Sequence, residues 1–170
     1  MKIFYLKKDE ILEKVGLEEL EKFSDGKTYT LEEKYIEHLC WLYLVNYVGP
    51  SYLGIVDTTV IYEDKKPVLK SGEYNFSVSH CENIVAVGFS RNNIGVDIEK
   101  MRERDFDRLA KRYGIPPEKE EFYKFWTKYE AVIKLGNSPK QVISKIIEKD
   151  YMLTCVLDSD KETDFEIISI

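Results

Sequence analysis

The chain of 170 residues is long enough for one well-buried domain and too short for two independent ones. Hydrophobic residues make up 44% of it and charged residues 33%, an ordinary balance for a folded protein that excludes extended disorder. The net charge of -6 disfavours nucleic acid as a partner, because such binding depends on cationic contacts to phosphates.

From the sequence we expect no membrane span, no secretory signal and no zinc-binding motif. No apolar run reaches the roughly 18 residues of a membrane span, and Lys7 introduces charge too early for a secretory signal, so we expect a cytoplasmic protein without a membrane partner. The cysteines Cys40, Cys81 and Cys155 are odd in number and far apart, which predicts reduced thiols. Without a C-x-x-C motif, structural zinc is disfavoured.

The N-terminal part of the chain predicts one strand followed by helices. Residues 2–6 form the strand, and residues 9–23 have apolar side chains at helical spacing. Residues 30–48 predict a second, mostly buried helix that ends at Gly49 and Pro50.

Short strands follow, and several of them show period-2 alternation. A polar stretch at residues 90–93 predicts a hairpin between the last two and therefore an antiparallel meander. The predicted strands cover residues 59–62, 68–69, 74–79, 84–89 and 94–99.

The C-terminal part predicts a charged segment, a long helix and a closing pair of strands. Residues 118–135 form the helix, which ends at Gly136, and residues 151–157 and 165–170 form the strand pair. One stripe of the helix is apolar, as is typical of a core-facing helix. The stripe consists of Phe122, Phe125, Trp126, Tyr129 and Ile133.

Two acidic side chains project from one face of the predicted strand 94–99. Alternation places Asp97 and Glu99 on the same face as Gly95, which leaves room beside them. Same-face positions are roughly 6.5 Å apart, so both carboxylates can bind one cation, and Mg²⁺ commonly binds one or two carboxylates together with substrate phosphates. From spacing alone, a solvent-exposed sheet face is the more common explanation.

Four short segments of the sequence carry a more specific signal: Lys66-Pro67, residues 75–80, residues 95–99 and residues 125–134. Each segment is modest alone, but their order and spacing together are specific. Taken in this order, they resemble the 4′-phosphopantetheinyl transferases of the larger, surfactin-synthetase-activating type, and the resemblance covers about residues 60–136.

The resemblance implies an α+β fold with two pseudo-twofold-related halves, each with a small antiparallel sheet and helices. We expect residues 1–73 and 74–170 to be these halves within one compact unit, with the metal site in the second. Coenzyme A would bind in the cleft between them. Because both halves belong to one chain, a monomer is expected.

The resemblance also implies a role for each site residue. Asp97 and Glu99 would bind Mg²⁺, and Glu130 would be the third ligand or the base that accepts the proton of the acceptor serine. Lys134, one turn beyond Glu130, would face the pyrophosphate, although this spacing also fits an exposed ion pair. The residues implied to contact coenzyme A phosphates are Lys66, Ser79, His80 and Lys134. An ordinary, partly buried histidine is the alternative for His80.

The implied activity is magnesium-dependent transfer of the 4′-phosphopantetheine group from coenzyme A to a serine of an apo acyl or peptidyl carrier protein, with release of adenosine 3′,5′-bisphosphate. Tyr129 departs from the family pattern, in which lysine usually precedes the helix glutamate. It either completes the apolar stripe or removes a charge near the phosphates. The alternative function is therefore a weak or inactive homologue that binds coenzyme A or a carrier protein.

Residues 100–113 are the candidate docking segment for the acidic carrier protein. They contain six positive and three negative residues, a local excess of positive charge in an acidic chain. A charged helix that only solvates the fold explains the same pattern equally well.

Overall fold

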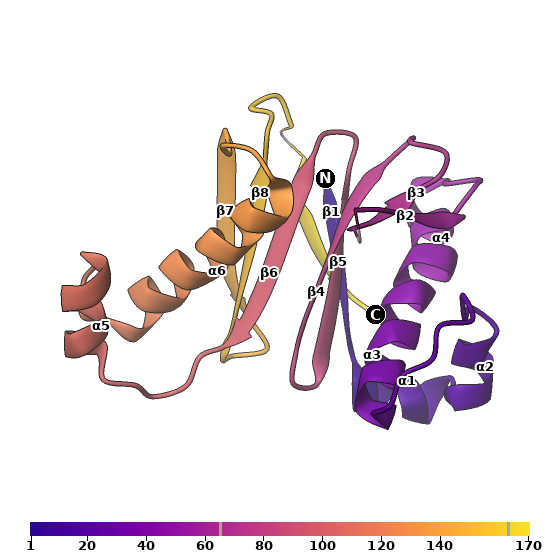
Figure 1. The fold of residues 1–170 in the computed structure, drawn as a ribbon, viewed down its shortest axis with the longest axis horizontal. Helices are drawn as coiled ribbons and strands as arrows, with labels where there is room; N and C mark the ends of the chain where they lie inside the picture. The colour runs from indigo at the N-terminus through magenta and orange to yellow at the C-terminus, as the bar shows by residue number, and fades with distance from the viewer. Residues whose placement is uncertain (65, 163) are drawn as a thin grey trace.

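Two β-sheets lie between helices at opposite ends of the molecule in a computed structural model, which describes residues 1–64, 66–162 and 164–170 (Figure 1). The helices are α1 Lys8–Lys14, α2 Leu17–Glu21, α3 Glu32–Tyr43, the π-helix η1 Leu44–Val48, α4 Gly49–Leu53, α5 Phe106–Tyr113 and α6 Lys119–Leu135. The strands are β1 Lys2–Lys7, β2 Val60–Glu63, β3 Lys66–Leu69, β4 Asn75–Cys81, β5 Ile84–Ser90, β6 Ile94–Lys100, β7 Gln141–Ile147, β8 Tyr151–Leu157 and β9 Glu166–Ser169.

The fold is mixed α+β, as the sequence predicts, and its sheets are small. One sheet has the order β4-β5-β1-β9, another has the order β6-β8-β7, and β2 and β3 form a separate hairpin. All pairs are antiparallel except β1 with β9. In the described part of the chain, no helix is long and apolar enough to cross a membrane.

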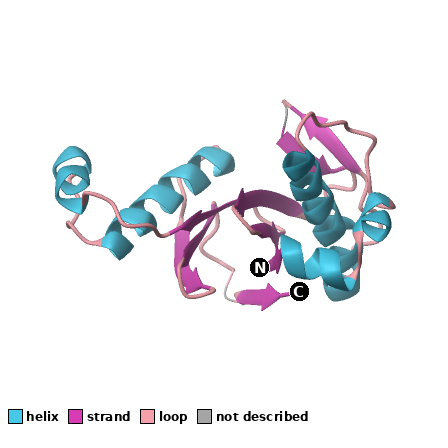
Figure 2. Cartoon of the chain, turned by 90° about the horizontal axis from the view of Figure 1, so that it is seen from below, coloured by secondary structure: helices cyan, strands magenta, loops and turns pink. Residues whose placement is uncertain are grey.

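Alternation along the strands divides the core into layers. Phe4 and Leu6 of β1 pack with α3 on one face of the four-stranded sheet, whereas Ile3 faces the other sheet. Val96 of β6 packs in this inter-sheet core. The order across the molecule is therefore α3, four-stranded sheet, three-stranded sheet and α6, which agrees with both views (Figures 1 and 2).

The two sheets are joined along one edge by side chains. Ser77 Oγ accepts the amide hydrogen of Val96 at 3.0 Å, and Ser79 Oγ accepts that of Ile98 at 3.2 Å. One step further along β4, Cys81 Sγ accepts the amide hydrogen of Lys100 at 3.3 Å. Side chains of β4 thus satisfy the edge amides of β6 in place of a backbone ladder. We call this contact the β4–β6 seam.

Three strand predictions are corrected by the pairing. Residues 90–93 connect the two sheets and do not form a hairpin turn, because β5 pairs with β4 and β1 while β6 pairs with β8. The expected closing pair does not form either, because β8 lies between β6 and β7 and β9 pairs with β1. Strand β7 was not predicted, because Val142, Ile143, Ile146 and Ile147 do not alternate strictly with polar residues.

The helix boundaries also differ from the predicted ones. Gly16, with φ of 85°, separates α1 from α2 within the helix expected at residues 9–23. The helix expected at residues 30–48 continues through η1 and α4 and ends at Gly54, whose φ is 69°. Pro50 is tolerated there because it lies in the first turn of α4, where its missing amide is not needed.

The division expected between residues 73 and 74 does not separate the sheets. Strands β4 and β5 follow that point, but β5 pairs with both β4 and β1, so the boundary falls inside the four-stranded sheet. The chain passes from one sheet to the other between β5 and β6.

Candidate functional site

The outer face of β6 is covered by α6, and Gly95 makes this close approach possible. A Cβ at Gly95 would lie 2.0 Å from the carbonyl oxygen of Ala131, so helix and strand pack backbone against backbone. The space beside Asp97 that was expected to stay open is therefore filled by the helix. This packing brings Lys134 of α6 onto the strand that carries the acidic residues.

Asp97 is a buried carboxylate with an asymmetric environment. Its Oδ1 atom accepts hydrogen bonds from Ser79 Oγ at 2.9 Å and from Lys134 Nζ at 2.8 Å. Its Oδ2 atom is buried and has no hydrogen-bond partner among the described residues. A buried carboxylate oxygen without a partner is costly, so this atom indicates a place for a ligand or a cation.

Ser79 has no hydrogen-bonding capacity left for a phosphate. Its hydroxyl donates to Asp97 and accepts from the amide of Ile98 and from Lys134 Nζ, the last at 3.0 Å. A hydroxyl has one hydrogen and two lone pairs, and all three are used. In this structure Ser79 therefore orients Asp97 and links β4 to β6.

Lys134 is anchored at the same place. Besides Asp97 and Ser79, its ammonium donates to the carbonyl oxygen of Val96 at 2.9 Å. The carbonyl of Lys134 in turn accepts a hydrogen bond from Lys66 Nζ at 3.2 Å, which connects β3 to the end of α6. The ammonium thus lies over the seam beside the buried carboxylate.

Glu99, the next residue on this face of β6, is half-buried and accepts a weak hydrogen bond from the Cys81 thiol at 3.7 Å. Burial, followed by the negative charge of Asp97, raises the pKa of Glu99 above its usual value. A bound cation would offset the part of this shift that the charge of Asp97 causes.

Glu130 is half-buried on α6, four residues before Lys134 and thus on the same side of the helix. In residues 1–64, 66–162 and 164–170, no group of three or more His, Cys, Asp or Glu side chains is close enough to hold a metal ion. The expected ligands Asp97, Glu99 and Glu130 are therefore not gathered around one point.

These residues nevertheless fit a hard divalent cation. Asp97 Oδ2 lacks a partner, and its charge opposes ionisation of Glu99. If Asp97, Glu99 and Glu130 are all ionised, the ammonium of Lys134 leaves two negative charges without balance. Oxygen ligands with this charge are those that Mg²⁺ prefers.

His80 lies on the opposite face of β4 from Ser79, toward α3. Its Nδ1 atom is 3.4 Å from Oε2 of Glu37, a buried residue of α3. Partial burial lowers the pKa of His80, whereas the charge of Glu37 acts to raise it. Sequence analysis missed Glu37, because the contact with His80 joins residues far apart in the chain.

A groove runs along the seam between β3 and the end of α6. Its volume is about 360 Å³. Lys66 and Lys134 contribute cationic side chains, and Pro67, Phe76 and Val78 contribute apolar surface. Two of the predicted phosphate contacts thus line one groove, whereas His80 is not among its lining residues.

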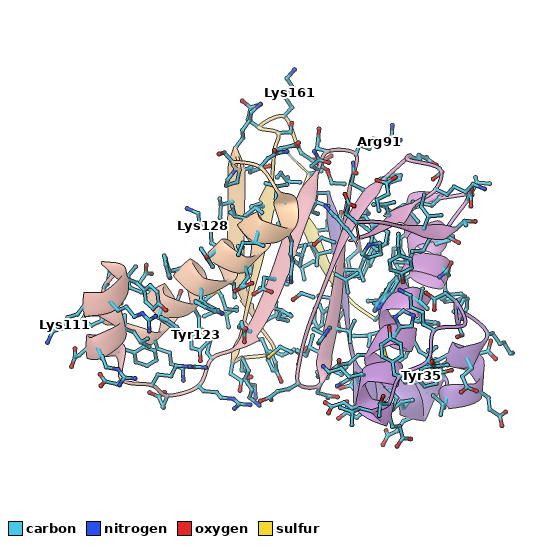
Figure 3. All side chains as sticks on the ribbon, in the orientation of Figure 1. Tyr35, Arg91, Lys111, Tyr123, Lys128 and Lys161 are labelled. Atoms are coloured by element: carbon cyan, nitrogen blue, oxygen red, sulfur yellow. The ribbon has the colours of Figure 1, made fainter. Side chains whose placement is uncertain are left out.

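A second cavity, of about 400 Å³, lies on the other side of Glu99 between α5 and α6. Arg104 and Arg112 of the candidate docking segment line it together with Glu99 and Trp126. Two other cations of this segment, Lys100 and Arg102, are paired with Glu82. Lys111 projects from the outer end of α5 and Lys128 from α6 (Figure 3).

The apolar stripe predicted for α6 is only partly its core face, because Phe122 is buried and Trp126 packs against the core, whereas the later residues of the stripe are exposed. Tyr129 is 52% exposed and Ile133 58% exposed. The Tyr129 ring stacks on Phe125, with centroids 6.5 Å apart. The residues buried on α6 are Phe122, Tyr123, Thr127, Ala131 and Leu135. The smaller side chains of Thr127 and Ala131 allow the close approach to β6, so size and not only apolarity decided which face is buried.

No protein-family model matches the sequence, and no curated protein matches it significantly.

Proposed function

We propose that this protein transfers the 4′-phosphopantetheine group of coenzyme A to a serine of an apo carrier protein, with Mg²⁺ as cofactor. The observation that carries the proposal is the buried Asp97, whose Oδ2 atom has no partner while Lys134 and Glu99 lie next to it. This acidic centre with one ammonium lies beside a groove that Lys66 and Lys134 line. Acidic and basic groups side by side suit a metal-bound pyrophosphate.

The layered architecture supports a 4′-phosphopantetheinyl transferase-like fold as part of this proposal. Helix α3 covers one small sheet and α6 covers the other, and the two units meet at the seam of β4 and β6. Such a repeated unit is what two pseudo-twofold-related halves would produce.

In the proposed reaction, Asp97, Glu99 and Glu130 would hold the cation, and Lys134 would neutralise charge on the pyrophosphate. The bound Mg²⁺ would stabilise negative charge that develops on the phosphate oxygens. The serine oxygen forms a bond to the β-phosphorus while the bond from that phosphorus to the bridging oxygen breaks, and adenosine 3′,5′-bisphosphate leaves. A carboxylate, which we assign to Glu130, accepts the serine proton directly or through water.

The carrier protein is proposed to dock over α5. Arg104 and Arg112 line the cavity beside Glu99, and Lys111 projects into solvent nearby. Positive charges at this place would attract an acidic carrier toward the carboxylates despite the overall negative charge of the chain.

The direct test mixes the protein with coenzyme A, Mg²⁺ and several apo carrier proteins and measures the added group by mass spectrometry. We expect modification of at least one carrier and its loss in Asp97→Asn, which keeps the side-chain shape and removes the charge. Glu13→Gln, a change at an exposed residue of α1 outside the proposed site, serves as the control. An Asp97→Asn variant with full turnover would contradict the assignment.

The second candidate function is a non-catalytic protein that binds coenzyme A or a carrier. The contact between Lys134 and Asp97 favours it, because the ammonium already occupies one oxygen of the proposed metal ligand. Coenzyme A binding without modification of any carrier, measured on the same samples, would favour this candidate.

A further inference from the structure

We infer that Glu37 is a positioning residue that orients His80 toward a phosphate group of the substrate. The inference rests on the proposed function for the identity of that substrate. It concerns a cluster of charged residues on α3, β4 and the start of α1, away from the carboxylates of β6. We call it the Glu37 cluster; it consists of Lys8, Glu33, Lys34, Glu37 and His80.

Glu37 holds cations from three parts of the chain. Lys8 Nζ donates to its Oε1 atom at 3.2 Å, and Lys34 Nζ donates to its Oε2 atom at 2.7 Å. His80 Nδ1 contacts the same Oε2 atom at 3.4 Å. Burial alone would raise the pKa of Glu37, but Lys34, His80 and Lys8 outweigh it and the pKa is lowered. The carboxylate is therefore ionised at neutral pH.

The two lysines already satisfy both oxygens of Glu37, so fold stability does not require the histidine there. His80 is nevertheless held with Nδ1 toward the carboxylate, and its side chain is 41% exposed. A hydrogen on Nδ1, facing Glu37, leaves Nε2 as the ring nitrogen for an external partner. Carboxylates orient histidine rings in the same way in many functional sites.

The charges that surround His80 make an anion the fitting partner. Lys34, Lys134 and Lys8 all act to lower its pKa, and Glu37 is the group that acts to raise it. A phosphate group at Nε2 would favour the protonated ring, whose second hydrogen would then be donated to a phosphate oxygen. Glu37 would stabilise this imidazolium, while Lys8 and Lys34 keep the carboxylate in place.

Glu37, acting through His80, is therefore expected to favour ligands that have an additional phosphate. Coenzyme A and adenosine 3′,5′-bisphosphate carry a 3′-phosphate that dephospho-coenzyme A lacks. Loss of the Glu37 charge should weaken binding of the first two by about tenfold, which corresponds to about 1.4 kcal/mol. Binding of dephospho-coenzyme A should change by less than about twofold.

The experiment records ¹⁵N NMR spectra of the histidine rings, of which the chain has two, with and without adenosine 3′,5′-bisphosphate. In the wild type we expect hydrogen on Nδ1 of His80, and a higher pKa of that ring with ligand. In Glu37→Gln the pKa of His80 should fall. Glu33→Gln is the matched control, since Glu33 contacts Lys8 but is 70% exposed.

Each outcome has a defined meaning. A folded Glu37→Gln variant with unchanged His80 pKa and unchanged bisphosphate affinity would overturn the inference. If that variant does not fold, the wild-type titration decides, and a His80 signal that bisphosphate leaves unmoved counts against it. Wild-type protein that binds neither coenzyme A nor bisphosphate would instead refute the proposed function, and the His80 pKa in Glu37→Gln would still test the orientation by Glu37.

Discussion

Two buried carboxylates, Glu37 on α3 and Asp97 on β6, are surrounded by opposite charge balances. Both oxygens of Glu37 have cationic partners, and its cluster is balanced once His80 is neutral. Asp97 has one ammonium on Oδ1, no partner on Oδ2, and Glu99 next to it. The charges around Glu37 are balanced without a ligand, whereas the charges around Asp97 leave an excess of negative charge.

The comparison teaches that burial of an acid does not by itself define its function. Full pairing lowers the pKa of Glu37, and partial burial beside another acid raises that of Glu99. A divalent cation at β6 and a phosphate near His80 would complete the two regions in complementary ways. The predictions below distinguish the Glu37 cluster from the carboxylates of β6.

The largest effect is expected for Gly95→Ala. The new Cβ would meet the Ala131 carbonyl at 2.0 Å, so α6 must move away from β6. Overpacking of this kind costs about 3 kcal/mol in unfolding free energy. Lys134 and Glu130 would move with the helix, while the Glu37 cluster would remain.

Urea unfolding measures the loss in Gly95→Ala, and His80 NMR signals report the Glu37 cluster. Gly88→Ala is the control, because its Cβ would meet the Val96 side chain at 2.6 Å inside the inter-sheet core and not α6. An unaltered unfolding midpoint in Gly95→Ala would show that the helix is not packed as described.

The pH dependence of Glu37→Gln and Glu99→Gln should have opposite signs. Because the pKa of Glu37 is lowered from 4.5 in the fold, its contribution is present above pH 4.5 and is lost as pH falls through the lowered value. Glu37→Gln should therefore be about 2 kcal/mol less stable than wild type at pH 7. The difference should close in acid.

Because the pKa of Glu99 is raised from 4.5 in the fold, the protein loses stability as pH rises from 4.5 through the raised value. Glu99→Gln avoids this loss and should be more stable than wild type at pH 7, by less than about 1 kcal/mol. Thermal melts of both variants from pH 3 to pH 8 test the pair. If the stability difference from wild type changed with pH in the same direction for both variants, the comparison would be refuted.

A smaller effect is expected when Lys134 is replaced by methionine. Without its ammonium, Asp97 Oδ1 keeps only the hydrogen bond from Ser79 and loses a competing positive charge, so Mn²⁺, as a probe for Mg²⁺, should bind roughly three- to tenfold more tightly in the absence of coenzyme A. Coenzyme A itself should bind more weakly. Electron paramagnetic resonance of free Mn²⁺ measures the first effect, and Lys66→Met is the control because the ammonium of Lys66 donates to the Lys134 carbonyl and not to Asp97.

The smallest effect is expected for Tyr129→Lys. Tyr129 is 52% exposed and contacts Phe125 and Trp126 through its ring, so its replacement should cost less than about 1 kcal/mol. The side chain of a lysine at position 129 would not have to be buried. Thermal melting tests this, and a drop of more than about 8 °C would show that the ring is part of the core.

The sequence by itself determined the α+β class, the positions of most strands and the face of β6 that carries Asp97 and Glu99. Local periodicity encodes these features, because neighbouring residues alone decide which side chains share a face. The structure has Gly95 and Asp97 on one face of β6, toward α6, as that periodicity predicts.

Tertiary structure alone decided the partners of these residues. Pairing of β9 with β1, the seam of β4 with β6 and the contact of Glu37 with His80 join residues distant in the chain, and no local pattern specifies them. The buried face of α6 followed from shape, since Gly95 and Ala131 let the backbones meet and turned the larger Tyr129 outward. Close packing selects among faces that hydrophobicity alone leaves equivalent.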